Sequence, residues 1–240
     1  MIEPDWPAPP GVRALSTERM GGVSIGPYRS LNLAGHVGDE PGAVAANRDA
    51  LVRSLSLAAP PCWLEQVHGP HVLDLDTEPP GRADGAVTST LGRVCVVLTA
   101  DCVPVLLAAR NGTRVGAAHA GWRGLAAGVL PAAVARMGKS PAQVQAWLGP
   151  AIGPTSYEVD ADVRDAFVGS DPGTDACFAP TRPGHWHADL YRLARASLAQ
   201  AGVEAVYGGN FCTFAESERF FSHRREAPCG RMATLIWRTA

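Results

Sequence analysis

Short apolar runs, separated by glycine-bearing turns, follow one another through the middle of the chain. Runs of this kind, rich in valine and leucine, are typical of strands buried within a sheet. We expect such strands at residues 72–75, 94–99, 103–109 and 115–119. Further strand-like runs lie near the two ends, at 12–16, 203–207 and 234–237.

Helical spacing of apolar residues marks a second kind of segment. Asp39 and Pro41 are typical of an N-cap region and a first helical turn, and apolar residues then recur at helical spacing as far as residue 56. We expect a helix over 41–56. Further helices are expected at 124–137, where Pro131 should start, kink or divide the helix, and at 160–167 and 188–201.

The interleaving of strands and helices predicts a mixed α/β architecture whose sheet draws on both ends of the chain. No internal repeat or low-complexity linker divides the sequence, so a single domain over 1–240 is expected, with 1–11 as an irregular segment. Residues 169–184 carry Asp-Pro-Gly and Arg-Pro-Gly and are expected to form a surface loop.

Composition narrows the class of partner. The 240 residues are 46% hydrophobic and carry a formal net charge of -2, so they provide no broad basic surface for nucleic acid or an anionic membrane. A small-molecule substrate fits better. The N-terminus has neither a basic nor an apolar leader region, and no run approaches the ~18 apolar residues of a membrane span, so a cytoplasmic protein is expected.

Six cysteines lie far apart along the chain, and none belongs to a Cys-x-x-Cys pair. The spacing therefore indicates neither a zinc ribbon nor a thioredoxin-type site. In a reducing compartment most of these residues should behave as small buried hydrophobes.

Three residues stand apart from this background: His68, Cys102 and His119. Each lies beside glycine or proline at the edge of an apolar run, where a side chain can face a cleft. Two imidazoles and one thiolate are the ligand types of a transition-metal site that keeps a position open for substrate. Their spacing matches no local zinc motif, so structural histidines and an inert cysteine remain the alternative.

The remaining histidines carry weaker signals. His36 lies in a glycine-punctuated loop that would line either a pocket or the surface, and His71 is either a further ligand or a solvent-facing residue. His185 and His187 fall near the expected surface loop, where a surface role is the default.

Several arginines are candidates for binding an anionic group. Arg224 and Arg225 are adjacent and in a loop would be able to clamp a phosphate, and Arg123 and Arg19 lie beside glycine-rich segments. The competing interpretation for each is an ordinary surface charge.

A series of motifs follows in a fixed order along the chain: Thr17-Glu-Arg-Met-Gly-Gly-Val-Ser, Ser30-Leu-Asn-Leu, Gln66-Val-His-Gly, Ala83-Asp-Gly, Leu98-Thr-Ala-Asp-Cys-Val-Pro, Ala118-His-Ala-Gly-Trp-Arg-Gly, Gly149-Pro-Ala-Ile-Gly-Pro, Phe220-Phe-Ser and Gly230-Arg-Met. Together these motifs resemble one known family, the purine nucleoside phosphorylase family once called multicopper polyphenol oxidases or laccase-domain proteins. The resemblance runs from about residue 12 to residue 238.

The resemblance implies a single α-β-β-α layered domain with mixed sheets and a zinc site made by His68, Cys102 and His119, which would also be the catalytic residues. It implies phosphorolysis of adenosine, inosine, guanosine and methylthioadenosine, with hydrolytic deamination of adenosine. Bacterial members have also been linked to editing of peptidoglycan precursors.

Phosphorolysis also requires a cradle for phosphate. Arg225, Arg48 and the Gly21-Gly22 loop are our candidates for it, and Asn32 is a further candidate for substrate binding. The partners are thus a nucleoside and phosphate, and the oligomeric state is not predicted.

The sequence departs from the family pattern at Glu65, His223 and Cys229. The pattern has a basic or neutral residue, Tyr and commonly Thr at these places. The histidine at 223 is the change closest to the expected anion cradle. None of the three departures touches the proposed metal ligands.

Three other functions use the same residues. The first fills the site with copper, as Cu²⁺, and oxidises phenols. The second is a thiol hydrolase, acting for example in peptidoglycan precursor editing, in which Cys102 is the nucleophile, His119 or His68 the base, and Asp101 or Asp84 the residue that orients the imidazole. The third is a purely structural metal, which would need a fourth protein ligand, such as His71.

Overall fold

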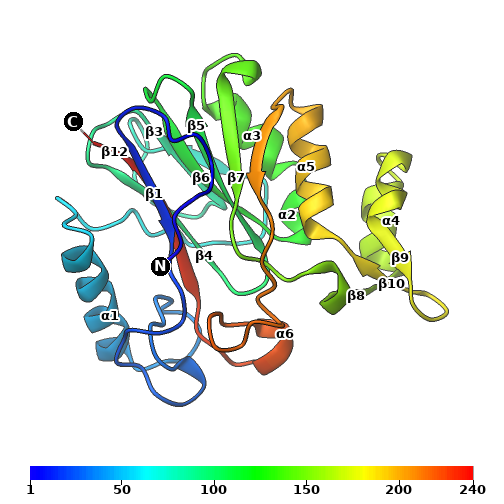
Figure 1. Ribbon diagram of the computed structural model, residues 1–240, viewed down its shortest axis with the longest axis horizontal. Coiled ribbons are helices and arrows are strands. Elements are labelled where there is room, and N and C mark those ends of the chain that lie inside the picture. The colour runs from blue at the N-terminus through cyan, green and yellow to red at the C-terminus, as the bar shows by residue number, and fades with distance from the viewer. Residues whose placement is uncertain (240) are drawn as a thin grey trace.

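The computed structural model describes residues 1–239, and its centre is a six-stranded mixed sheet (Figure 1). In order across the sheet, the strands are β11 (Ala205–Gly208), β7 (Val144–Leu148), β5 (Val103–Ala109), β6 (Val115–Ala120), β3 (Gly85–Thr88) and β2 (Val72–Asp74). The outer pairs β11/β7 and β2/β3 are parallel, and the pairs between them are antiparallel.

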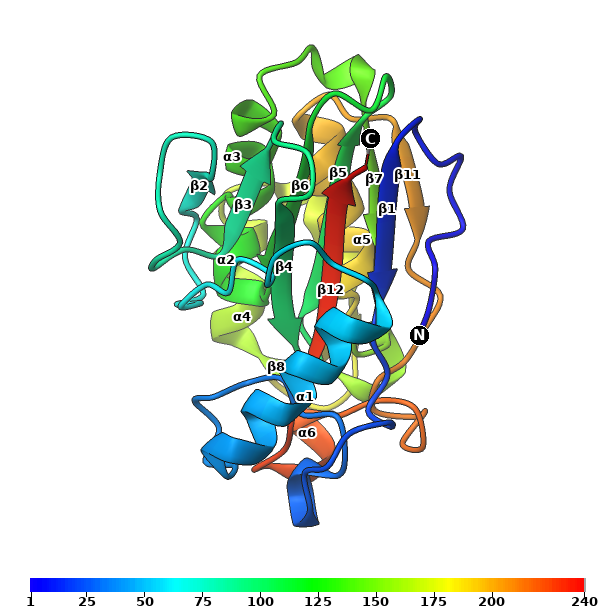
Figure 2. The ribbon, with the colours of Figure 1, turned by 90° about the vertical axis from the view of Figure 1, so that its left-hand side faces the viewer.

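A second, three-stranded antiparallel sheet joins the two ends of the chain. Its order is β1 (Val12–Ser16), β12 (Met232–Arg238) and β4 (Val94–Thr99). In Figure 2 these strands lie in front of the larger sheet, with α1 (Pro41–Ser54) across them. The predicted use of both chain ends is confirmed, although they build a separate sheet.

The alternation of residues along β4 explains the layering, because successive side chains of a strand point to opposite faces. Cys95 and Val97 pack inward against residues of the larger sheet such as Leu106. Val96 packs outward in the cluster that includes Leu51 of α1. The layers are therefore helix, sheet, sheet and helix, as the family resemblance implied.

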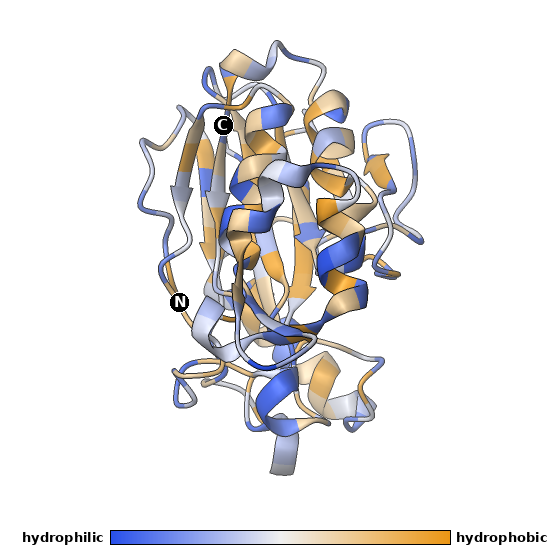
Figure 3. Cartoon of the chain, turned by 90° about the vertical axis from the view of Figure 1, so that its right-hand side faces the viewer, coloured by the Kyte–Doolittle hydropathy of each residue, from blue (hydrophilic) through white to orange (hydrophobic). Residues whose placement is uncertain are grey.

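The opposite face of the larger sheet is covered by α2 (Trp122–Ala126), α3 (Val129–Arg136) and α5 (Leu190–Gln200). Beside them lie α4 (Ala161–Val168) and a small antiparallel sheet of β8 (Glu158–Asp160), β10 (His185–Ala188) and β9 (Phe178–Pro180). Figure 3 shows hydrophobic residues along the strands, whereas the helices carry both hydrophobic and hydrophilic residues. The last helix is α6 (His223–Glu226).

Three local predictions require correction. The helix expected over 124–137 divides at Gly128, which has a φ of +87°, and Pro131 lies in the first turn of α3, where its missing N–H costs little. The segment 169–184 is not a loop throughout, because it contains a 3₁₀ helix at Pro172–Cys177 and then β9. The N-cap of α1 is Glu40, whose carboxylate accepts from the Gly42 and Ala43 amides.

Asp39, which the sequence placed in the N-cap region, instead accepts hydrogen bonds from Ser24 Oγ and Asn32 Nδ2.

Within residues 1–239, none of the helices has the length and apolar character that crossing a bilayer requires.

Candidate metal centre

The His68 loop is fixed by the side chains of its neighbours. Gln66 pairs with β4: its Nε2 donates to the Leu98 carbonyl at 2.8 Å, and its Oε1 accepts from the Leu98 amide at 2.7 Å. The carboxylate of Asp84 accepts from the backbone amides of His68 and Gly69 at 2.9 and 2.7 Å. His68 has a φ of +60°, an uncommon conformation that these contacts maintain.

Sheet register brings Asp84 and His119 together. In the β3/β6 pair Gly85 lies opposite Ala118, so the residue before β3 lies beside His119. The His119 amide donates to the Asp84 carbonyl at 2.6 Å, and His119 Nδ1 lies 2.8 Å from Asp84 Oδ1. A carboxylate can only accept, so Nδ1 carries the proton and Nε2 is the ring's free ligand atom.

Cys102 directly precedes β5, which pairs with β6 on the side opposite β3. In the antiparallel β5/β6 pair Val103 lies opposite Ala120, which places Cys102 beside the end of β6. The preceding Asp101 has a φ of +92° and is anchored by Thr213 Oγ1 and the Arg224 amide, which donate to its carboxylate at 2.6 and 2.7 Å. This anchoring fixes the turn that presents the thiol.

The three side chains converge. One ligand atom from each of His68, Cys102 and His119 lies within 4.8 Å of the other two, and the two imidazole rings meet edge to face with centroids 4.7 Å apart. Gly121 makes this approach possible, because a Cβ there would lie 2.9 Å from Cys102 Sγ and 3.1 Å from His68 Cδ2. His71 is exposed and does not join this group in the described chain.

The electrostatics of the centre favour a thiolate. Burial by itself would raise the pKa of the Cys102 thiol, but the charge of His119 and hydrogen bonds from His119 and His68 lower it to about 6. Burial would lower the pKa of His119, but the Cys102 charge and the Asp84 hydrogen bond raise it to about 9. Metals bind thiolate sulfur and imidazole nitrogen, so this donor set fits a zinc-type ion.

A cavity of about 180 Å³ opens onto the three ligands. His223 and Arg231 form part of its wall, and neither was predicted as a site residue. His36 also lines it, which resolves the choice left open by the sequence; burial and the charges of Arg231, Arg48 and His68 lower the pKa of His36. The other residues that line this metal cavity are Gln66, Leu98, Thr99 and Ala100.

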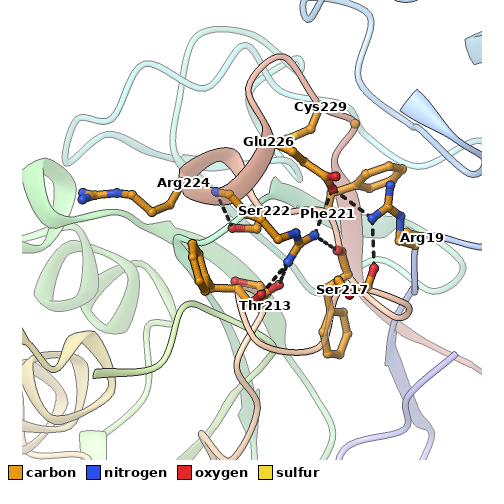
Figure 4. Close-up of polar contacts among 12 residues, drawn as sticks. Arg19, Thr213, Ser217, Phe221, Ser222, Arg224, Glu226 and Cys229 are labelled. Carbon is orange, nitrogen blue, oxygen red and sulfur yellow. Dashed lines mark hydrogen bonds and ion pairs between the residues drawn. The ribbon is translucent and has the colours of Figure 1, made fainter. Parts of the chain in front are cut away.

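The predicted phosphate cradle is not assembled here. Arg225 is committed to its own segment: its guanidinium donates to the carbonyls of Thr213, Phe214 and Phe220 and pairs with Glu226. Figure 4 shows this network, with Glu226 also facing Arg19, whose Nη1 donates to it at 2.9 Å. Arg225 therefore holds the 213–226 segment together.

The other predicted substrate residues also have structural partners. Arg48 donates to the Leu33 carbonyl and stacks on Trp63, and neither it nor Asn32 lines the metal cavity. The Gly21 and Gly22 amides donate to Ser30 Oγ at 3.0 and 3.2 Å. These groups stabilise the fold around the site.

A second cleft, of about 460 Å³, has Tyr157 in its wall. Arg123, Arg182 and Arg224 contribute to its wall, as do His185 and the aromatic ring of Trp122. Glu158, Asp160 and Asp162 line it as well, so its basic and acidic side chains are balanced. Arg123 and Arg224, two of the anion-binding candidates from the sequence, thus lie in this cleft. The cleft itself was not predicted, because its wall comes from segments far apart along the chain.

The sequence matches the family described as multi-copper polyphenol oxidoreductase laccase over residues 13–239, and the chain belongs to this family. It is 54% identical to a protein of Xylella fastidiosa (strain Temecula1) named purine nucleoside phosphorylase, over 97% of this chain and 95% of the relative. It is 51% identical to Purine nucleoside phosphorylase YfiH of Escherichia coli (strain K12), over 99% of this chain and 98% of the relative.

Solved structures agree with this assignment. A Neisseria meningitidis protein superposes with a TM-score of 0.96 at 46% identity, covering 100% of this chain and 99% of that one. YlmD of Geobacillus stearothermophilus superposes with a TM-score of 0.88 at 35% identity, covering 96% and 93%. The fold and the family that the sequence motifs suggested are thus confirmed.

Proposed function

We propose that this chain is a zinc-dependent purine nucleoside phosphorylase that acts on adenosine, inosine, guanosine and methylthioadenosine. The observation that carries the proposal is the convergence of His68, Cys102 and His119 on one cavity. The names of the relatives, which match this chain over nearly its whole length, supply the reaction class.

Zinc suits the donor set because one thiolate and two imidazoles are typical ligands of catalytic zinc. When bound, such an ion supplies Lewis acidity and lowers the pKa of a coordinated water. The protein prepares the ligands: Asp84 holds His119 in one tautomer, Gln66 fixes the His68 loop, and Gly121 leaves room for the sulfur.

In phosphorolysis an oxygen of phosphate forms a bond to ribose C1′ while the C1′–N9 bond breaks. The electron pair of that bond passes to the purine, which gains a proton and leaves as the free base, and the sugar product is ribose 1-phosphate. The protein must therefore hold phosphate and nucleoside together in a site that limits competition from water. The metal cavity is large enough to enclose the phosphate and the reacting part of the sugar.

We infer hydrolytic deamination of adenosine as a second activity of the same centre. His68, Cys102 and His119 would hold the ion, which would supply an activated water for hydrolysis at purine C6 with loss of ammonia. This activity needs no phosphate, and the requirement for phosphate separates it from nucleoside cleavage.

Copper is the alternative cofactor. Two histidines and a cysteine are also the donor set of electron-transfer copper sites, which add a weak axial ligand, commonly Met. No methionine lines the metal cavity, and the described residues offer one three-ligand group of this kind. Both observations favour zinc and phosphorolysis over phenol oxidation.

A metal-free thiol hydrolase acting in peptidoglycan precursor editing is the other alternative. His119 contacts both the Asp84 carboxylate and the Cys102 thiol, which is the arrangement of an acid, a base and a nucleophile in a catalytic triad. Removal of metal distinguishes the two functions: a chelator abolishes a zinc reaction and leaves a triad active.

The direct experiment incubates purified protein with adenosine, inosine, guanosine or methylthioadenosine, with and without phosphate, in anaerobic buffer. Chromatography then identifies adenine, inosine, hypoxanthine and ribose 1-phosphate. Phosphate-dependent release of base, lost with a chelator and restored by zinc, supports the proposal. Absence of base release for all four nucleosides in the zinc-loaded protein contradicts it.

A further inference from the structure

We propose that Arg231 is the residue that holds the phosphate co-substrate in the metal cavity, with Asn32 as the residue that positions it. The inference rests on the proposed phosphorolysis and names the anion site that the reaction needs. It replaces Arg225 and Arg48, whose guanidinium groups contact the fold elsewhere.

Arg231 presents a donor edge that the protein does not use. Its Nη1 donates to the carbonyls of Cys229 and Gly230 at 2.8 and 3.1 Å and contacts Cys229 Sγ at 3.4 Å. Its Nε and Nη2 have no hydrogen-bond partner among residues 1–239. Arginine donors in this planar arrangement match two oxygens of a phosphate.

The metal cavity and the second cleft differ in the charged side chains that line them. The metal cavity is lined by Arg231 and by His36, His68, His119 and His223, and its lining includes no aspartate or glutamate. In the second cleft, three arginines meet three carboxylates. Arg231 is therefore a fixed cation beside the proposed metal ligands, and no carboxylate in the lining of the cavity pairs with it.

The size of the metal cavity points to the same ligand. Pockets for drug-sized molecules typically enclose about 300–1,000 Å³, and this cavity encloses about 180 Å³. It suits a small anion and the reacting part of a sugar better than a whole nucleoside.

Asn32 explains how the Arg231 backbone is held. Asn32 is fully buried, and its Oδ1 accepts from the amides of Arg231 and Ala34, both at 3.0 Å. Its Nδ2 donates to Asp39 at 2.9 Å, and the next amide, that of Leu33, donates to the Arg231 carbonyl at 3.3 Å. Asn32 thus acts on substrate through Arg231.

The test compares Arg231→Gln and Arg231→Lys with Arg13→Gln, an exposed arginine that stacks on Trp237 in the three-stranded sheet. With the zinc-loaded enzyme we expect Arg231→Gln to raise the KM for phosphate about 10- to 100-fold, as loss of charged hydrogen bonds implies. The KM for nucleoside and the metal content should stay within about two-fold. Arg231→Lys should fall between Arg231→Gln and wild type.

Asn32→Ala should raise the KM for phosphate by a smaller factor than Arg231→Gln, with the metal content unchanged. A purely structural role for Asn32 would lower thermal stability and leave the ratio of the two KM values unchanged, and that result would overturn its assignment as a positioning residue.

Phosphate binding is also measured without turnover, by protection of Arg231 against phenylglyoxal and by calorimetric titration with inorganic phosphate. Binding that Arg231→Gln weakens supports the site even if no nucleoside is cleaved, so the site and the proposed function fail separately. Unchanged phosphate affinity in a folded Arg231→Gln protein overturns the inference. A larger effect from Arg123→Gln overturns it too, in favour of the second cleft.

A nucleotide 5′-phosphate has the same chemistry as free phosphate, and a parallel titration with adenosine 5′-monophosphate separates them. We expect inorganic phosphate to compete for Arg231 and the nucleotide to bind more weakly than phosphate. Loss of nucleotide binding in Arg231→Gln, with an unchanged KM for phosphate, would contradict the assignment.

Discussion

Asp84 and His119 form the contact on which the centre depends: the Asp84 carboxylate lies 2.8 Å from His119 Nδ1, and both side chains are almost completely buried. The same carboxylate accepts the amides of the His68 loop. Asp84, which lies between β2 and β3, therefore orients two of the three proposed ligands, His68 and His119.

Asp84→Asn should lower metal affinity about 10- to 100-fold, the usual effect of removing a carboxylate that orients a ligand histidine. The amide retains the shape but offers one acceptor oxygen in place of two. Titration with a chromophoric chelator measures the affinity. Asp76→Asn is the control, because Asp76 binds the Thr88–Thr90 turn through its carboxylate and lies outside the metal cavity. Equal metal affinity for the two variants would contradict the orienting role of Asp84.

Gly121→Ala should reduce metal content and activity while the protein remains folded. The added methyl would lie 2.9 Å from Cys102 Sγ, closer than van der Waals contact permits. Gly81→Ala is the matched control, since nothing lies within 4 Å of a Cβ at that position. Metal analysis and circular dichroism check both. A Gly121→Ala protein with full metal content would show that the sulfur is not confined here.

Cys102 in the metal-free protein should react with iodoacetamide faster than the other cysteines at pH 7. Its lowered pKa, about 6, makes the thiolate dominant above that pH, whereas burial raises the pKa of Cys95 and Cys62. The rate should reach half its plateau near pH 6 and fall when zinc is added. Mass spectrometry of the labelled peptides measures it. Equal labelling with and without zinc would argue against Cys102 as a ligand.

Thr99 lines the metal cavity, and its buried hydroxyl has no hydrogen-bond partner within residues 1–239. Thr99→Val removes this uncompensated group with little change in shape and should raise the free energy of unfolding by about 1 kcal/mol. Val97→Thr, two residues earlier on the same strand face, should lower it by about 1–3 kcal/mol. Urea denaturation checks both, and destabilisation by Thr99→Val would show that the hydroxyl has a partner.

The sequence indicated the three residues of the candidate metal centre better than their surroundings. His68, Cys102 and His119 were visible because each lies in a local motif at a strand edge, and β5 and β6 were visible because they carry continuous apolar runs. The roles of Asn32 and Arg225 were not visible, because side-chain and main-chain hydrogen bonds between distant segments determine them. Arg231 was missed as a site residue for the same reason.

The secondary structure was also predicted best where the local pattern of apolar residues is strong. Strand β4 was predicted over its observed bounds, since its apolar run is uninterrupted. Strands β3 and β7 of the larger sheet were not predicted, although both are buried. Strands β8, β9 and β10 were missed because they are short and lie in a glycine- and proline-rich region, where pairing between segments overrides local preference.

X-ray absorption at the metal edge of the purified protein tests the central claim most directly. The account predicts one zinc per chain with one sulfur at about 2.3 Å, two imidazole nitrogens at about 2.0–2.1 Å and a remaining oxygen ligand, and loss of the metal in Cys102→Ser. A spectrum without sulfur, or one that shows a fourth protein ligand, would contradict an open site formed by His68, Cys102 and His119.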